Sequence, residues 1–580
     1  MSRLSYHFLA LFFLLAVTTF TAAQEMTPAE AEALKASDKQ AFEFLETIAE
    51  GIPSLRAFEN RIYLTNAVAD LLWSKDEKRA RGLFDAVTRE MVAAVAAYEP
   101  SDQERYNDQR MIQQQRQDTI DRMANHDPEM AMAFLRATRF PVTSESTQYR
   151  ANETELEFHL AAMIAERDPA QALRVARNSL RKGIPYSIVQ VLSQIHAKDR
   201  NSAQSLHAEI VDRLKTEELS RNHEVVNNAW NLLNSYRPPE AKEETYRELI
   251  ELMVGAALTV NPRDSASISL ANNFYYQLRS AVPQIEKYVP GRLPAVRQWI
   301  ERVQRTQDPG TRMYQEINDL AEKGTIDDIL ALAGKYGPEL QTQIYQQAVG
   351  KALSSGEPNR AQQIISEFVT DPAQRRQMLE QLDNQLAWNS VQGNQIAETR
   401  RRLSRIKRVE QRANLLMSLA MNVASAGNKK QGLDLLTEAR ALLDSSPLDS
   451  STLISRLQLA QNYSSLDSEE GVALLESIIM RMNQLVAAAA VLDGFEDRYL
   501  KDGEWLKANH TNLGNLVRNL TQNIGELARR DPTSARYLSN KLERPEIRLM
   551  AQLEIVQSLL GGVEQTHPTL TGRSVRINLK

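Results

Sequence analysis

A capping-type residue followed four positions later by a small residue recurs nine times along this chain, and this pattern constrains the fold more than any other feature. The pairs are Asp76 and Ala80, Asp127 and Ala131, Asp168 and Ala172, Asp199 and Ala203, Glu357 and Ala361, Gly393 and Ala397, Asn428 and Gly432, Asp467 and Gly471, and Asp531 and Ala535. An Asp or Asn side chain at the N-cap accepts a hydrogen bond from an orphan backbone N–H of the first helical turn. A small side chain one turn further on lets a neighbouring helix approach closely.

The residue four positions before the cap is usually apolar, as at Leu72, Met123, Ile164 and Ile195. It would end a preceding helix whose inner face points at the helix that follows. Each unit is then a helix, a tight turn and a second helix, and one such pair cannot bury its apolar stripe alone. The sequence therefore predicts an all-α chain of stacked antiparallel helix pairs, an α-solenoid or superhelix. Ordinary helix capping without stacking is the alternative.

The spacing becomes regular in the second half of the chain. The caps at Glu357, Gly393, Asn428 and Asp467 lie 36, 35 and 39 residues apart. Residues 341–485 resemble the tetratricopeptide repeat, whose period is close to this. The positions that match the family's helix contacts and turn are Leu416, Leu419, Ala420, Val423, Gly427, Gly432, Leu436 and Ala439. The resemblance implies a fold only, and the irregular spacing of the N-terminal half is typical of a degenerate solenoid.

Breaks in the helical pattern predict the domain organisation. We expect a signal peptide over 1–23, an N-terminal helical region over 24–140, a middle helical-repeat region over 154–307, a C-terminal tetratricopeptide-like array over 311–562 and a tail over 563–580. The segment from Pro141 to Glu153 is polar and rich in turn-forming residues, so it is predicted to be a loop.

The N-terminus has the pattern of a secretory signal peptide. Arg3 precedes an apolar stretch from Phe8 to Phe20, and small residues up to Ala23 offer a cleavage site. An uncleaved anchor is the alternative. No later segment is expected to be apolar for long enough to span a membrane. Because oxidising compartments favour disulfides in exported eukaryotic proteins, the absence of any cysteine indicates a bacterial periplasmic or secreted protein.

Composition narrows the possible partners and chemistry. The chain has 74 acidic and 69 basic residues, a net charge of −5, which gives no overall preference for nucleic acid or anionic membrane. The lack of cysteine excludes thiol nucleophiles and Cys–zinc sites. The sequence predicts no cofactor and no metal ion, and it leaves the oligomeric state open.

The search for catalytic motifs gives no enzyme prediction. His223 and Glu224 begin a zinc-protease-like run that lacks its second histidine. His196 and His207 fall on neighbouring predicted helices, where two structural histidines are the simpler interpretation. Ser179 and Lys182, like Ser404 and Lys407, have the serine–lysine spacing of penicillin-interacting enzymes without the companion motifs.

Two clusters could form binding surfaces. Arg401, Arg405, Arg408 and Arg412 would share one face if a single helix ran through them, although a turn could interrupt it. A solvated face partly neutralised by neighbouring repeats is the alternative to an anion-binding surface. The aromatic residues Phe274, Tyr275, Tyr276, Tyr288 and Trp299 could line a groove, but packing between helices is the more ordinary interpretation.

Three classes of function remain open. The favoured hypothesis is a non-enzymatic scaffold that binds a protein or peptide of the cell envelope, since stacked helix pairs create long binding surfaces. The alternative is an all-α enzyme acting on envelope or extracellular polysaccharide. Lytic transglycosylases resemble this chain in being exported helical superhelices, but their catalytic motifs have no match here. Toroidal glycosidases use aromatic clefts, whereas aromatic residues total 6% of this chain. A self-assembling spacer that stacks through its end repeats is the third possibility.

Overall fold

The computed structural model describes residues 28–97, 103–139, 147–264, 267–307, 309–495, 499–507 and 511–561. The described residues are helical apart from short connections and one small hairpin, which confirms the all-α prediction. The predicted signal peptide at 1–23 and the tail at 563–580 lie outside the described residues, so both stay predictions.

The chain divides into two compact units, and each boundary falls inside a helix. Unit 1 comprises Met1–Leu64 and Leu436–Lys580, and unit 2 comprises Thr65–Leu435. The boundaries lie within α3 (Phe58–Leu72) and α22 (Lys429–Asp444). The domain limits predicted from sequence are a different division and stay predictions.

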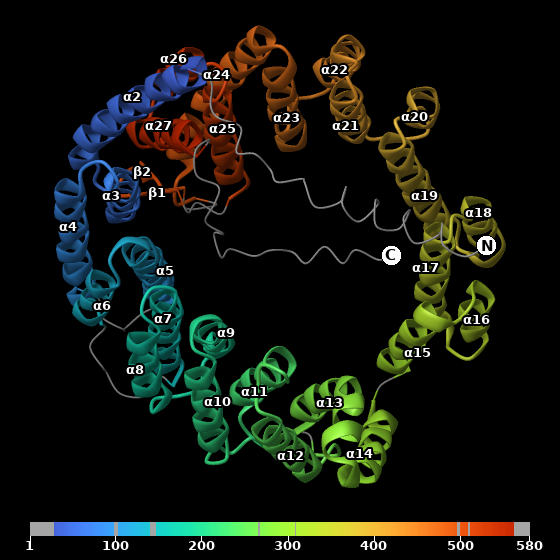
Figure 1. The fold of residues 1–580 in the computed structure, drawn as a ribbon. Helices are drawn as coiled ribbons and strands as arrows, with labels where there is room; N and C mark the ends of the chain where they lie inside the picture. The colour runs from blue at the N-terminus through green and yellow to red at the C-terminus, as the bar shows by residue number, and fades with distance from the viewer. Residues whose placement is uncertain are drawn as a thin grey trace, which may run out of the picture. The chain divides into compact units, whose positions relative to one another are not determined.

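Unit 2 is a succession of helices, most of which pack on their neighbours in chain order (Figure 1). They are α4 (Glu77–Ala96), α5 (Gln103–His126), α6 (Pro128–Ala137), α7 (Thr147–Ala165), α8 (Pro169–Leu180), α9 (Ile188–Lys198), α10 (Arg200–Leu214), α11 (His223–Ser235), α12 (Glu243–Thr259), α13 (Ile268–Tyr288), η3 (Pro290–Arg292), α14 (Leu293–Thr306), α15 (Pro309–Lys323), α16 (Ile326–Ala331), η4 (Leu332–Gly334), α17 (Pro338–Ser354), α18 (Pro358–Phe368), α19 (Pro372–Gln392), α20 (Ile396–Leu403) and α21 (Val409–Ser425).

Unit 1 contains both ends of the described chain. Its helices are α2 (Pro28–Gly51), η1 (Ile52–Ser54), α23 (Ser450–Leu466), α24 (Ser468–Leu492), α25 (Asn512–Ala528), α26 (Pro532–Asn540) and α27 (Pro545–Leu560). The strands β1 (Leu500–Lys501) and β2 (Glu504–Trp505) form an antiparallel hairpin. Within this unit α27 packs against both α25 and α2, so the first described helix contacts the last.

The capping pattern produces tight turns, as the sequence predicted, and at Asp127, Asp199 and Asp467 the turn is a single residue. Asp199 ends α9 by donating its backbone N–H to Ile195 O at 2.7 Å. The same residue begins α10, where its side chain accepts the N–H of Ser202 at 3.1 Å. The caps with this side-chain bond are Asp76, Asp127, Asp168, Asp199, Asn428, Asp467 and Asp531.

Stacking of one pair on the next is also confirmed. Helix α7 contacts its partner α8 and also α5 and α9, while α25 contacts α23, α26 and α27. The small residues one turn after the caps are buried, including Ala80, Ala131, Ala172 and Ala203. The described chain is therefore a tetratricopeptide-like α-solenoid at the level of fold.

In the segment that most resembles the tetratricopeptide repeat, the expected contacts are buried. Leu416, Leu419, Ala420 and Val423 of α21 are each at most 5% exposed. Gly427 has a φ of +97° in the turn, a conformation that favours glycine because other side chains clash there. This explains the glycine at the family's turn position.

Two local predictions were wrong. The cap of α20 is Gln395 rather than Gly393, so the buried residue one turn on is Thr399, and Ala397 is exposed. The Thr399 hydroxyl lies 2.8 Å from that of Ser390, which supplies a polar contact where a small apolar residue was expected. The loop predicted from Pro141 to Glu153 is helical from Thr147, where α7 begins.

Candidate binding surface

The two histidines of the middle region converge on one tyrosine. His196 Nδ1 lies 2.9 Å from the hydroxyl of Tyr236, and the His207 ring packs edge-on against the Tyr236 ring at 5.1 Å. His207 is fully buried, and burial lowers its pKa to about 4. Burial likewise raises the pKa of Tyr236 to about 12. Because both histidines meet an aromatic side chain rather than a third ligand, the arrangement is a packed cluster.

Most of the aromatic group is core. Phe274, Tyr275 and Trp299 are at most 1% exposed. The Tyr275 hydroxyl donates to Gln315 Oε1 at 2.7 Å, and Trp299 Nε1 donates to the backbone oxygen of Val260 at 3.1 Å. Tyr276 is half exposed and Tyr288 is partly buried. The packing interpretation is therefore confirmed for the three buried rings.

The basic run does not lie along one helix. A turn separates α20, which ends at Leu403, from α21, which begins at Val409. The hypothesis of a single basic face along Arg401, Arg405, Arg408 and Arg412 was therefore wrong. Four of the basic side chains in the run pair with acidic groups of α19 and α20. Arg401 and Arg402 both pair with Glu398, the latter at 2.6 Å, while Arg405 pairs with Asp383 at 3.4 Å and Lys407 with Glu380 at 3.8 Å. Partial neutralisation by neighbouring helices is confirmed.

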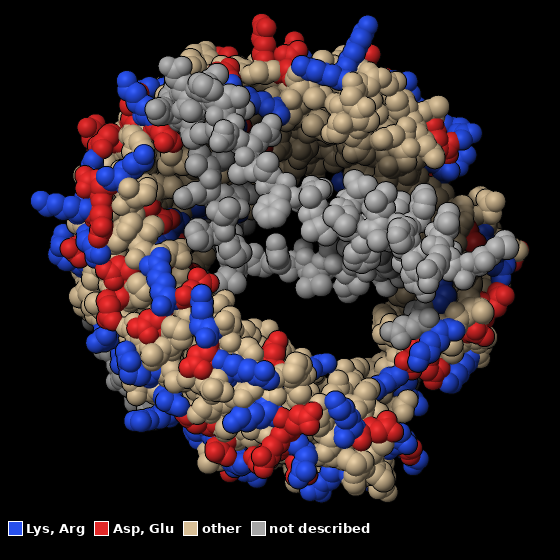
Figure 2. Space-filling view, viewed as in Figure 1, with Lys and Arg blue, Asp and Glu red and all other residues tan. Residues whose placement is uncertain are grey.

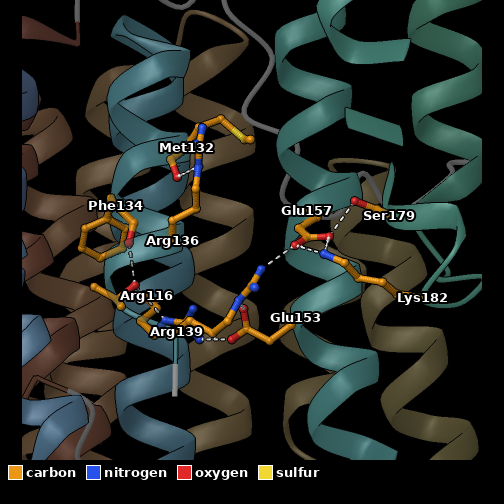
Figure 3. Close-up of polar contacts among 10 residues, drawn as sticks. Arg116, Met132, Phe134, Arg136, Arg139, Glu153, Glu157, Ser179 and Lys182 are labelled. Atoms are coloured by element: carbon orange, nitrogen blue, oxygen red, sulfur yellow. Dashed lines mark hydrogen bonds and ion pairs between the residues drawn. The ribbon is translucent and has the colours of Figure 1, made fainter. Parts of the chain in front are cut away.

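Ser179 and Lys182 share a carboxylate on the preceding helix (Figure 3). The hydroxyl of Ser179 donates to Glu157 Oε2 at 2.6 Å, and Lys182 Nζ donates to the same oxygen at 2.6 Å. Arg139 also donates to this carboxylate, at 2.8 Å. Ser179 is 2% exposed. The spacing thus serves an ion-pair network between α7 and α8, and the hydroxyl is not presented to a substrate.

A fully buried arginine was missed by sequence reasoning. Arg116 of α5 pairs with Glu153 of α7 at 2.6 Å and donates to Thr138 at 3.1 Å (Figure 3). It lies in a polar, glutamine-rich stretch whose composition predicts a solvent-exposed helix. Only the packing of α5 against α6 and α7 places it inside.

The two most exposed large apolar side chains among the described residues lie in the last turn of α24 and just after it. Val491 is 77% exposed and Phe495, three residues beyond the helix, is 85% exposed. Met480, near the middle of α24, is 59% exposed. Ala487, Ala488 and Leu492 are exposed on the same stripe, at helical spacings of three and four. We call the set Ala487, Ala488, Val491, Leu492 and Phe495 the α24 face.

Length and composition make α24 an exception to the expectation that no later segment could span a membrane. The helix has 25 residues, and its most apolar window of 18 residues has a mean hydropathy of 1.3, with a third of that window buried. The expectation was wrong on this point because a run of alanines extends a repeat helix. The opposite side of α24 packs against α23, α25 and α26.

A groove of about 260 Å³ lies beside the α24 face. Its walls are Val486, Ala487 and Ala490 of α24, together with Leu542 and Ile547 near the start of α27. At one end a hydrogen bond joins the two walls, because Asn483 Nδ2 of α24 donates to the backbone oxygen of Lys541 at 2.9 Å. Glu543 and Arg544 lie at the rim. The α24 face therefore borders a fixed apolar recess rather than a flat surface.

Charge is mixed over the rest of the visible surface. Figure 2 shows Lys and Arg interspersed with Asp and Glu, without a broad region of one sign on that face. Among the described residues, no group of three or more His, Asp or Glu side chains is arranged to hold a metal ion.

Comparisons with known proteins give no family. No family model matches the chain, and no curated protein matches it in sequence. Among known structures it is similar to a circular tandem repeat protein with novel repeat topology, at 16% identity over 91% of this chain and 98% of that chain, with a TM-score of 0.14. It is also similar to a homology model of the full-length AP-3 complex in an intermediate open conformation, at 12% identity over 96% of this chain and 89% of that chain, with a TM-score of 0.22. The third is the APC/C hetero-tetramer Cut9–Hcn1, at 11% identity over 84% and 98%, with a TM-score of 0.16. TM-scores this low carry no argument, so the solenoid fold rests on the helix pairs and caps described above.

Proposed function

We propose that this protein is a non-enzymatic scaffold of the cell envelope that binds a protein partner through the α24 face. The observation that carries the proposal is the exposure of Val491, Leu492 and Phe495 beside the 260 Å³ groove. Contiguous apolar side chains are costly to leave in water, and on monomeric proteins such patches mark interaction sites. The solenoid supplies the rigid support, because α24 is fixed on its other side by three helices.

Two features support the remainder of the proposal. The signal-peptide pattern ending near Ala23 favours export, and N-terminal sequencing of the exported protein should find Gln24 as the first residue. The contact between α2 and α27 weighs against a spacer that stacks through its ends, because these end helices already pack on each other within one chain.

The test is site-specific photo-crosslinking of the mature protein in intact envelopes. A photoreactive residue in place of Val491 should give a discrete crosslinked species. The same residue in place of Glu469 should not, because Glu469 is exposed in the first turn of α24 and belongs neither to the groove nor to the α24 face. The partner is then purified, and binding is measured for wild type, Val491→Ser, Phe495→Ser and Glu469→Ser. Equal binding by all four proteins would overturn the proposal. Release of reducing sugar ends from an envelope polysaccharide would favour the enzyme alternative instead.

A further inference from the structure

A second groove, in unit 2, lies along one face of α12. It has a volume of about 530 Å³ and is bordered by the segment after α10, by α12 and by η3. The α12 residues that line it are spaced by three and four positions, so they form one continuous stripe of the helix. They are Glu248, Glu251, Leu252, Gly255, Ala256 and Thr259.

The floor of the groove is small and apolar. Leu219 and Leu252 contribute aliphatic surface, and Gly255 leaves the centre of the stripe open. A Cβ built on Gly255 would meet nothing within 4 Å, so packing does not require glycine there. Glycine inside a helix is destabilising relative to alanine. Gly255 thus leaves room in the groove, although glycine destabilises the helix and no neighbouring contact requires it.

The charged groups of the groove are of two kinds. Lys215 is held between Glu248 and Asp212 at 2.8 Å each, while Glu217 and Glu218 pair with arginines outside the lining. Glu251 and Arg292 differ, because neither side chain has an ion-pair or hydrogen-bond partner among the described residues. One carboxylate and one guanidinium thus line the same groove without neutralising each other.

We propose that the α12 groove binds a peptide segment that carries a basic side chain for Glu251, an acidic side chain for Arg292 and a small aliphatic side chain over Gly255. The inference rests on the proposed binding function and adds a second site with a defined partner chemistry. A groove of this volume lies within the range of ligand sites, which combine an apolar floor with a few placed polar groups. Opposite charges across such a groove select partners by complementarity.

The probes are short fluorescein-labelled serine-rich peptides that carry one Val between two charged residues, as Lys/Glu, Lys/Lys or Glu/Glu, at varied spacing. Fluorescence anisotropy with the full chain should show tightest binding by a Lys/Glu probe. Loss of either charge from the protein, in Glu251→Gln or Arg292→Gln, should weaken that probe by up to about fivefold, as for exposed ion pairs.

Charge reversal and filling of the groove give sharper tests. Arg292→Glu should switch the preferred probe to Lys/Lys, and Glu251→Arg should switch it to Glu/Glu. Gly255→Leu should abolish binding of all three probes. Gly82→Leu is the control, because Gly82 is also a helical glycine of unit 2 with nothing within 4 Å of its Cβ position.

The outcomes separate this inference from the proposed function. Absence of binding by every probe, or equal binding by Gly255→Leu and Gly82→Leu, would overturn the α12 site while leaving crosslinking at Val491 intact. Conversely, Phe495→Ser should leave probe binding unchanged, so failure of the α24 proposal would not remove probe binding to the α12 groove.

Discussion

The carboxylate of Glu504 accepts the backbone N–H of Arg56 at 2.6 Å, which joins residues 448 positions apart. Its other oxygen accepts the N–H of Ala57 at 3.1 Å and the side-chain amide of Asn60 at 3.2 Å. These donors lie between η1 and the first turn of α3, where helix starts leave N–H groups without partners. The Glu504 side chain of the β1–β2 hairpin thus accepts hydrogen bonds from three donors in the N-terminal part of unit 1.

Replacing Glu504 should therefore destabilise unit 1. Glu504→Ala removes the acceptor of the buried Ala57 N–H and of the part-buried Arg56 N–H, and leaves the Asn60 amide with only its bond to Trp505 O. We expect a loss of about 3 kcal/mol in unfolding free energy. Hydrogen exchange should increase most at Arg56 and Ala57. Glu543→Ala removes an exposed glutamate of the same unit and should leave both measurements near wild type. Equal protection of residues 56 and 57 in wild type and Glu504→Ala would contradict this role.

The close approach of α23 and α24 should make Gly471 intolerant of any side chain. A Cβ there would lie 2.6 Å from Ser464 N and 2.7 Å from Ser464 Cα, and these backbone atoms cannot move aside without shifting a helix. We expect Gly471→Ala to lower the unfolding free energy by about 1–3 kcal/mol, the usual cost of overpacking. Thermal unfolding checks this.

Gly82 provides the opposite case. Nothing lies within 4 Å of its Cβ position in α4, so Gly82→Ala should raise stability by up to about 1 kcal/mol through helix propensity alone. If Gly82→Ala and Gly471→Ala had the same effect, steric contact between α23 and α24 would not be the reason for glycine at position 471.

Breaking the buried ion pair of Arg116 and Glu153 should lower the unfolding free energy strongly, whereas replacing both residues with apolar ones should lower it little. Arg116 is fully buried and its partner's side chain is 9% exposed. Arg116→Met should cost about 3–5 kcal/mol because it leaves a buried carboxylate without its main partner. The double variant Arg116→Met/Glu153→Met should recover most of that loss, since paired removal of buried charges is often near neutral. A double variant no more stable than Arg116→Met would contradict this account, and urea unfolding measures both.

His207 should make stability fall in mild acid. Its pKa is about 4 when folded against an ordinary value of 6.5, because burial disfavours the charged ring. Its contribution is complete above pH 6.5 and is lost as the pH falls toward 4, by about 3 kcal/mol in total. His207→Leu should therefore lose less stability than wild type between pH 7 and pH 4.5, as measured by urea unfolding.

His159 is expected to act in the opposite direction. His159 Nε2 donates a hydrogen bond to the Asp121 carboxylate at 2.6 Å, and this bond raises the pKa of His159 above its ordinary 6.5. The stability that this pair contributes is present below pH 6.5 and is lost as the pH rises through the folded pKa. His159→Gln should thus be less stable than wild type at pH 6 and closer to it at pH 9. If the stability of both variants relative to wild type changed in the same direction with pH, one of the two histidine assignments would be wrong.

The sequence by itself determined the local structure. An Asp at the cap, often with Pro after it, binds its own backbone within one turn, so cap, turn and helix start follow from neighbouring residues alone. Turn glycines such as Gly427 are local in the same sense. Where the cap residue was a weak one, as at Gly393, the prediction failed by two positions because nothing local fixed the start of α20.

Only the tertiary structure decided which of these helices' faces are covered. Arg116 and Val491 invert the usual rule, since the charged residue is buried and the apolar one is exposed. Helical periodicity places a residue on a face, but the neighbours of that face come from distant parts of the chain. Packing between distant segments accounts for the burial of Arg116 by α6 and α7, for the exposure of the α24 face and for the Glu504–Arg56 bond. No local sequence pattern predicts such packing.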